Sequence, residues 1–235
     1  MYIWTDDAIR WLSDAAVYSG YYGKLAVHIA KYLPERTNIC DMGCGLGFLA
    51  EELSKYAAGV TAIDINEKAL SVLGKKHIAG VAAICCDALT HTPDVQYDAA
   101  VFCFFGEPGE ILSQMERHIA KKLIIIKSET PEHNFTLKEV PERKHMLGPL
   151  IEEFDARKIE YVHESFVLEF GQPFSSIEDA TAFFRHYGGY DDPNQITGKT
   201  IEPLLIQLDD PVFPFYREVK KNIGMVVLND KKTYE

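Results

Sequence analysis

The stretch that decides the fold is TNICDMGCGLGFLAEEL, residues 37–53. Its first five residues have the character of a buried strand, and they run through three glycines (Gly43, Gly45 and Gly47) into a segment with apolar residues at helical spacing. Glycine permits unusual backbone angles and lets a ligand approach the chain closely. The helix N-terminus beyond the turn offers free N–H groups and the positive end of the helix dipole. We therefore predict that this turn contacts a nucleotide-like ligand.

Short apolar runs recur after this stretch, and helix-like segments separate most of them. Continuous apolar strands that alternate with amphipathic helices are typical of a parallel sheet covered on both faces. The sequence thus predicts a doubly wound α/β fold. The predicted strands span 37–41, 59–64, 81–87, 98–105 and 121–127, and the predicted helices between them span 46–58, 66–77 and 107–120.

An acid closes each of the first three predicted strands, at Asp41, Asp64 and Asp87. Both steps between these acids are 23 residues long, which is one strand-plus-helix unit each time. In open α/β sheets, ligands bind at the carboxyl ends of the strands. We therefore expect the three carboxylates to crowd one edge of the sheet and to share one site.

The flanking segments are expected to extend a single domain. Helical spacing predicts two N-terminal helices, and a further strand, a helix that begins after Ser176, a helix near 200–208 and a last strand at 225–230 follow the core. The two late strands would close a seven-stranded, mostly parallel sheet, with a small helical insertion before the last strand. The predicted division is an N-terminal helical cap at 1–36, a core at 37–170, an insertion at 171–222, and the last strand with a tail at 223–235.

Two classes of cofactor use a glycine turn of this kind. Dinucleotide enzymes need G-x-G-x-x-G, but the third position counted from Gly43 and Gly45 is Phe48. Asp41 is a poor neighbour for a pyrophosphate and a good one for a ligand that carries an ammonium group. These residues favour S-adenosylmethionine, which has an amino acid tail and a sulfonium cation, over a nicotinamide dinucleotide.

Three short segments resemble motifs of the class I S-adenosylmethionine-dependent methyltransferases. DMGCGLG (41–47) matches the D-x-G-x-G-x-G first motif, AIDIN (62–66) looks like the second and CCDAL (85–89) like the third. The resemblance covers residues 37–127. It implies the Rossmann-like methyltransferase fold, S-adenosylmethionine as cofactor and S-adenosylhomocysteine as product.

The resemblance also implies roles for individual residues. Asp64 would bind both ribose hydroxyls, Asp87 would accept a hydrogen bond from the adenine amino group, and Phe104 would lie near the methyl group. Tyr22 belongs to a helix that would cover the cofactor, although packing of that helix on the sheet is the simpler explanation. The cofactor-binding residues implied in this way are Asp41, Gly43, Cys44, Gly45, Asp64, Ile65, Asp87, Ala88, Phe104 and Tyr22.

The catalytic residues remain open at this stage. Methyl transfer from a sulfonium mostly requires that donor and acceptor are brought together, and only some such enzymes add a base. Glu107 and His133 are the candidates for a base. Glu107 also suits the start of the following helix, where the helix dipole stabilises an acid, and His133 suits an exposed loop.

Composition limits which classes of acceptor we expect and indicates the cellular compartment. The chain has 235 residues, and its 24 basic and 35 acidic residues give a net charge of −11. That charge argues against nucleic acid or an anionic membrane as a partner. There is no apolar run of membrane-spanning length and no secretory signal, and five cysteines, which fit no zinc spacing, indicate reduced thiols in the cytoplasm.

We therefore expect a cytoplasmic methyltransferase with a small-molecule acceptor and without a metal, whose oligomeric state is open. FFGEP (104–108) replaces the Asn/Asp-Pro-Pro-aromatic run of many members of the family that methylate nucleic acids and protein amides. Three alternatives remain: a non-catalytic cofactor-binding partner subunit, a transferase of another adenosyl-cofactor group such as aminopropyl, and an NAD(P) enzyme.

Overall fold

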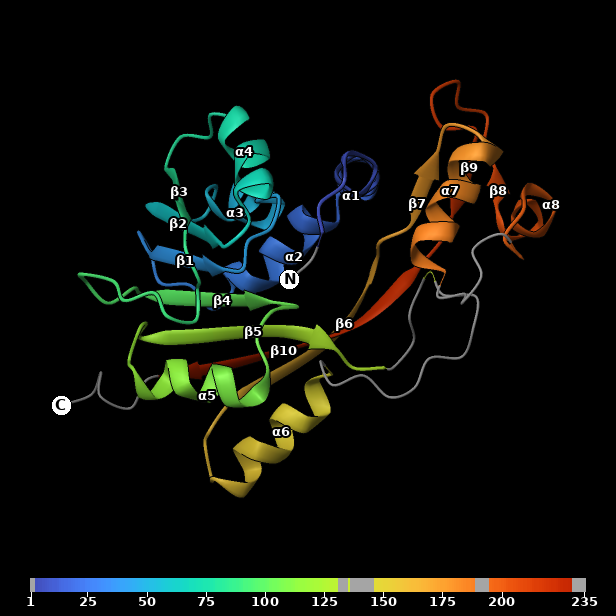
Figure 1. Ribbon diagram of the computed structural model, residues 1–235. Helices are drawn as coiled ribbons and strands as arrows, with labels where there is room; N and C mark the ends of the chain where they lie inside the picture. The colour runs from blue at the N-terminus through green and yellow to red at the C-terminus, as the bar shows by residue number, and fades with distance from the viewer. Residues whose placement is uncertain (1–2, 131–134, 136–145, 189–194, 230–235) are drawn as a thin grey trace. The chain divides into compact units, whose positions relative to one another are not determined.

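A seven-stranded sheet forms the centre of the fold in this computed structural model (Figure 1). In spatial order its strands are β3 (Val81–Cys85), β2 (Gly59–Asp64), β1 (Asn38–Met42), β4 (Ala99–Cys103), β5 (Lys122–Ser128), β10 (Lys220–Asn229) and β6 (Val162–Glu169). β1 to β5 pair in parallel, and β10 runs antiparallel to β5. This arrangement confirms the predicted α/β fold with a mostly parallel sheet of seven strands.

The structure describes residues 3–130, 135, 146–188 and 195–229. These residues form two compact units, which β6 and β10 both enter. The larger unit comprises 22–129, 146–166 and 222–229, and the smaller one comprises 3–21, 130, 135, 167–188 and 195–221. None of the helices in the described residues has the length and apolar character needed to cross a bilayer.

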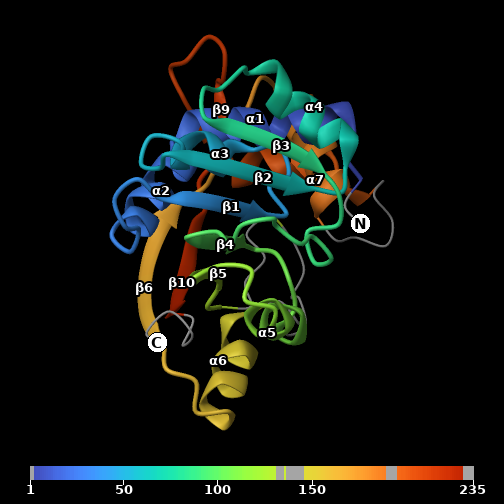
Figure 2. The ribbon, with the colours of Figure 1, turned by 90° about the vertical axis from the view of Figure 1, so that its left-hand side faces the viewer.

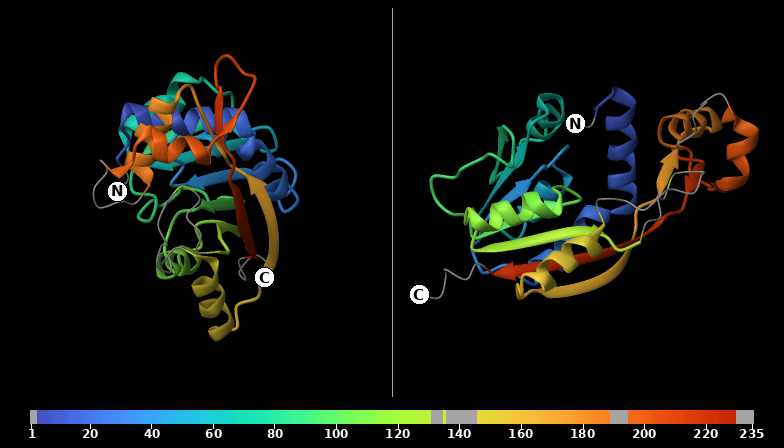
Figure 3. Two further views of the ribbon diagram at one scale, coloured as in Figure 1. Left: turned by 90° about the vertical axis from the view of Figure 1, so that its right-hand side faces the viewer. Right: turned by 60° about the horizontal axis from the view of Figure 1, so that its bottom comes forward.

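The helices of the main sheet follow the strands as the sequence pattern predicts. They are α2 (Tyr21–Ala30), α3 (Phe48–Leu53), α4 (Glu67–Lys75), α5 (Pro108–Glu116) and α6 (Leu147–Ala156). α4 lies beside β2 and β3 (Figure 2). α5 and α6 lie side by side along the sheet (Figure 3) and share a core cluster with it. Strands β1, β4 and β5 are buried almost throughout, as expected where helices cover both faces.

The helix starts that border the glycine turn have clear local causes. Asn66 is the N-cap of α4, and its side chain accepts from the Ala69 N–H at 3.1 Å. Pro108 opens α5, where its fixed backbone angle suits a first helical turn. The Glu107 N–H donates to the Glu110 carboxylate at 2.7 Å, which satisfies an amide that the helix itself leaves free. These caps fix where the loops at this edge of the sheet end.

The smaller unit has a sheet and a core of its own. Its antiparallel sheet has the order β7 (Gln172–Phe174), β9 (Phe215–Arg217), β8 (Ile206–Gln207), and its helices are α1 (Asp6–Ser19), α7 (Ile177–Tyr187) and α8 (Gly198–Ile201). Trp11 packs edge-on against Phe183 and donates to Asp179 at 2.9 Å. Ser176 caps α7 as predicted, since its hydroxyl accepts from the Asp179 N–H at 3.1 Å.

The region before the last strand differs from the prediction in two details. Besides the helices α7 and α8, the segment 171–222 contains the three strands β7, β8 and β9. The predicted helix at 200–208 is the end of α8, a 3-10 turn (Glu202–Leu204) and β8. Pro203 explains the difference, since proline removes a helical hydrogen bond and clashes with the preceding turn. The last strand also begins earlier than predicted, at Lys220.

Candidate active site

The glycine turn, residues 43–47, connects β1 to α3 and is fastened to the end of β2. The N–H groups of Gly43 and Cys44 both donate to the Ile63 carbonyl at 2.9 Å. Gly43, Gly45 and Gly47 have φ angles of 72°, 54° and 73°. This left-handed region is open to glycine and unfavourable for other residues. The three glycines are therefore required by the backbone of the turn, as the sequence predicted.

Replacing Gly43 by alanine should destabilise the protein. A Cβ atom at Gly43 would overlap the Phe105 ring, and its φ of 72° adds backbone strain. We expect the free energy of unfolding to fall by about 2 kcal/mol or more, measured by denaturant titration. Gly109→Ala is the matched control, because Gly109 lies in α5 and its Cβ would meet nothing within 4 Å. Equal stability of the two variants would contradict this account of the turn.

Asp64 holds the glycine turn with its side chain. One carboxylate oxygen, Oδ2, accepts from the Gly45 N–H at 2.8 Å, and the other, Oδ1, accepts from the Asn66 N–H at 2.8 Å. Each oxygen of a carboxylate has a second lone pair, so both can still accept from another donor. Ile65, between these contacts, exposes 56% of its surface. The end of β2 therefore presents a fixed carboxylate and an apolar side chain to solvent.

Asp41 is a buried carboxyl group beside the same turn. It is 1% exposed and accepts from the Ala50 N–H, an amide of the first turn of α3. Burial raises its pKa to about 7, and the nearby Asp64 carboxylate adds to the shift. Within the described part of the chain, Asp41 Oδ2 has no hydrogen-bond partner. A buried acceptor without a donor is costly. Its position suits a ligand that brings an ammonium group to the turn.

Tyr22 lies close to Asp41 from the side of α2. Its ring stacks on Phe48 with centroids 5.6 Å apart, and the Lys76 ammonium lies 3.7 Å from the centroid of the Phe48 ring. Burial raises the pKa of Tyr22, and Cys103 and Asp41 add to the shift, so the phenol stays protonated. Tyr22 therefore packs on helix α3 next to the glycine turn, and its role in covering the cofactor stays a prediction.

Phe104 follows β4 in a strained conformation. Its φ is 53°, and its side chain is 39% exposed. A bulky residue in the left-handed region is rare, and such strain tends to occur at functional sites. The Phe104 N–H donates to the Ile126 carbonyl at 2.8 Å. Because β4 pairs with β1, Phe104 lies at the same edge of the sheet as the turn.

The third strand contributes less than expected. Asp87 is exposed and accepts from the Leu89 N–H at 2.9 Å, which is a local turn bond. Ala88 is buried in the core cluster, so only its backbone is available to a ligand. Asp87 therefore stays the least constrained of the three acids that the sequence placed at this edge.

Cys44, another predicted cofactor-binding residue, lies in the glycine turn. Its thiol is half-buried there, and burial raises the pKa of the thiol.

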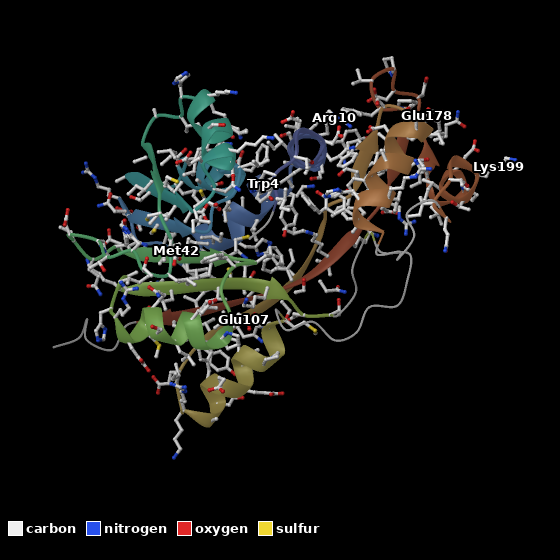
Figure 4. The ribbon with its side chains drawn as sticks, viewed as in Figure 1. Trp4, Arg10, Met42, Glu107, Glu178 and Lys199 are labelled. Carbon is white, nitrogen blue, oxygen red and sulfur yellow. The ribbon has the colours of Figure 1, made fainter. Side chains whose placement is uncertain are left out.

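The structure describes only one of the two candidate bases, Glu107 and His133. Glu107 is the N-cap of α5, the structural role that the sequence offered as its alternative (Figure 4). His133 lies outside the described residues. All five cysteines are free, and no group of three or more His, Cys, Asp or Glu side chains placed to hold a metal was found in the described residues. The structure therefore adds no support for either candidate as a base.

Sequence reasoning missed Lys127, which is fully buried near the end of β5. Its ammonium donates to the Gly106 carbonyl at 2.5 Å, directly beside Phe104 and Phe105. The available signal was a lysine close to the end of the otherwise apolar run KLIIIK. Because lysines are rarely buried, such a residue reads as the exposed end of a strand.

Comparison with known proteins agrees with this geometry. A family model described as a methyltransferase domain matches residues 39–122, the part of the chain that holds the glycine turn and the acids. The YcgJ protein of Bacillus subtilis has 13% identity and a TM-score of 0.56, over 89% of this chain and 99% of that one. The search of curated proteins found no match.

Two similar structures were solved with S-adenosylhomocysteine. The magnesium protoporphyrin IX methyltransferase of Synechocystis PCC 6803 has 13% identity and a TM-score of 0.52, over 92% of this chain and 86% of that one. The plantazolicin methyltransferase BpumL has 16% identity and a TM-score of 0.52, over 96% of this chain and 92% of that one. At such identities the likeness shows a common fold.

Proposed function

We propose that this chain is an S-adenosylmethionine-dependent methyltransferase of class I that methylates a small-molecule acceptor, because a methyltransferase-domain model matches residues 39–122 and the fold is that of similar methyltransferase structures. S-Adenosylmethionine is the cofactor and S-adenosylhomocysteine the product. One observation carries the proposal: the buried Asp41 carboxyl group, one oxygen of which has no partner among the described residues, adjoins a glycine turn that Asp64 holds in place. That combination fits the amino acid tail and the ribose of this cofactor.

We assign the cofactor contacts to one edge of the sheet. Asp41 and the backbone of Gly43, Cys44 and Gly45 would hold the amino acid tail, and Asp64 would accept from the ribose hydroxyls. The adenine would lie against Ile65, with Asp87 and the backbone of Ala88 at its edge. Phe104 would face the methyl group and Tyr22 would cover the tail.

The bound cofactor supplies a methyl group on a sulfonium, which already contains a good leaving group. The residues of this chain then have to bind, orient and exclude water, and proximity alone contributes about 7–11 kcal/mol in favourable cases. Glu107 is engaged in starting α5. Catalysis by positioning, without a dedicated base, is therefore the mechanism that we propose.

Two observations support a small-molecule acceptor. The net charge of −11 opposes the binding of a phosphate backbone. The two similar structures with bound S-adenosylhomocysteine are named as methyltransferases of magnesium protoporphyrin IX and of plantazolicin. The cytoplasmic location stays a prediction from the cysteine content.

Calorimetric titration tests the cofactor assignment. We expect S-adenosylmethionine and S-adenosylhomocysteine to bind and NAD to show no saturable binding, because Asp41 opposes a pyrophosphate at the glycine turn. Incubation with methyl-labelled S-adenosylmethionine and a metabolite extract then tests turnover and reports the acceptor. Binding of NAD in place of the adenosyl cofactors would overturn the proposal. Binding without transfer to any extract fraction would indicate a non-catalytic partner subunit.

A further inference from the structure

Lys127 is a buried cation next to the proposed cofactor site. Its side chain has no exposed surface, and burial lowers its pKa. Removing an ammonium from water is costly unless it is paired. Its hydrogen bonds go to the Gly106 carbonyl at 2.5 Å and the Phe105 carbonyl at 3.5 Å, and the negative charges of Glu107 and Glu110 partly offset the effect of burial on its pKa. The cost of burying this lysine calls for a compensating role.

Both carbonyls belong to the β4–α5 loop, residues 104–107. The loop contains two left-handed residues, Phe104 with a φ of 53° and Gly106 with a φ of 74°. Glycine adopts this conformation freely, but a phenylalanine such as Phe104 keeps it only where the surroundings enforce it. The Lys127 ammonium donates to two consecutive carbonyls of this loop, so it is one of the groups that enforce this conformation.

The loop in turn touches the glycine turn. The Phe105 ring occupies the space where Gly43 would carry a Cβ atom, and it stacks on Phe102 of β4 with centroids 6.4 Å apart. A chain of contacts therefore runs from the Lys127 ammonium, through the carbonyls and ring of Phe105, to the turn. A shift of the loop would move the backbone that faces the amino acid tail of the cofactor.

We propose that Lys127 is a positioning residue for the cofactor site, which holds the β4–α5 loop against the glycine turn. The inference rests on the proposed function, since it assumes that an S-adenosyl cofactor occupies this edge of the sheet. It assigns Lys127 to the end of the site that receives the amino acid tail. At the ribose and adenine end, the Asp64 carboxylate accepts from the Gly45 and Asn66 amides, and neither amide belongs to the β4–α5 loop.

A matched lysine separates this role from ordinary packing. Lys122 lies at the opposite end of the same strand, and its ammonium donates to the Tyr32 carbonyl at 2.6 Å. Burial lowers its pKa as well. Lys122→Met and Lys127→Met thus each remove one partly or fully buried lysine–carbonyl contact from β5. Only Lys127→Met does so beside the glycine turn.

The test compares two probes that cover different parts of the site. S-Adenosylhomocysteine carries the amino acid tail and adenosine does not. We expect Lys127→Met to weaken S-adenosylhomocysteine binding by about 10- to 100-fold in calorimetry, because the β4–α5 loop would no longer be held against the turn that receives the amino acid tail. Adenosine affinity, measured by NMR titration, should change less than about twofold, which is within the error of such titrations. Lys122→Met should change neither affinity.

The outcomes are distinct. If Lys127→Met leaves S-adenosylhomocysteine binding unchanged, or weakens both probes by the same factor, Lys127 has no positioning role. If that variant does not fold, Phe105→Leu tests the next contact of the same chain, the Phe105 ring against Gly43, and should show the same difference between the probes. If the wild-type protein binds neither probe, the proposed function itself is wrong.

Discussion

Replacing Asp64 by alanine is expected to weaken binding of S-adenosylmethionine and S-adenosylhomocysteine by about 100-fold or more. Three kinds of contact would be lost together. The carboxylate would no longer accept from the ribose hydroxyls, and the amides of Gly45 and Asn66 would lose their acceptor, which lies 2.8 Å from each. The glycine turn would therefore lose its fixed shape as well as its ribose contact. Calorimetric titration of both cofactor forms measures the effect.

Two variants control this experiment. Asp64→Asn keeps one oxygen acceptor and should lose less affinity than the alanine variant. Asp98→Ala also removes a carboxylate that accepts from a backbone amide, that of Asn38 at 2.9 Å, but it lies before β4 at the other edge of the sheet. Its cofactor affinity should match that of the wild type. Unchanged affinity in Asp64→Ala would remove Asp64 from the site.

The main sheet could be predicted because its signals are local and repeated. β2 was predicted to the residue, at Gly59–Asp64, since an apolar run there lies between glycine at one end and a helix cap at the other. Helix ends were less accurate. The helix predicted at 107–120 ends at Glu116, because the apolar residues Ile119 and Ala120, which continue the helical spacing, are buried in the segment after the helix.

The smaller unit could not be predicted in the same way. β7, β8 and β9 have two or three residues each, too few for an alternating pattern to be recognised. β9 pairs with β8 nearby in the sequence, but it also pairs with β7 across 41 to 45 residues, from Phe174↔Phe215 to Gln172↔Arg217. Pairing at such separations depends on tertiary structure, which overrides local propensity.

The residues of the candidate site differ in the same way: some follow from local sequence and others depend on tertiary packing. The glycines and Asp64 could be found because a turn and a strand end require particular residue types at fixed spacing. Lys127 and the buried state of Asp41 could not, because burial depends on what other segments cover them. The Phe105 ring against Gly43 is likewise a contact between loops some sixty residues apart, which no local pattern encodes.

Asp41→Asn is expected to stabilise the free protein and to remove the pH dependence of cofactor binding. The pKa of Asp41 is raised to about 7 in the folded protein, above the ordinary value of 3.8. The folded state therefore binds more protons than the unfolded state between these values, and this group's contribution to stability falls as pH rises through that window. Above pH 7 the ionised carboxylate is a constant penalty that asparagine lacks.

The expected gain in unfolding free energy for Asp41→Asn at pH 8 is on the order of 2–4 kcal/mol, measured by denaturant titration. Asp98→Asn should behave in the opposite way. The Asn38 amide and the Lys121 ammonium lower the pKa of Asp98, so its ionised form stabilises the folded state and this contribution disappears as pH falls. A loss of stability in both variants at pH 8 would contradict the burial of Asp41 as a penalised acid.

Cofactor affinity should depend on pH in the opposite sense to stability: it should rise as Asp41 ionises. An ammonium group at the turn favours ionised Asp41, so binding releases a proton from it. Affinity of the wild-type protein should fall roughly tenfold from pH 7.5 to pH 6, because one unit below its pKa only about a tenth of an acid is ionised. Asp41→Asn should bind more weakly at pH 7.5, with little change over this range. A wild-type affinity independent of pH would show that the Asp41 carboxylate does not meet the ammonium group of the cofactor.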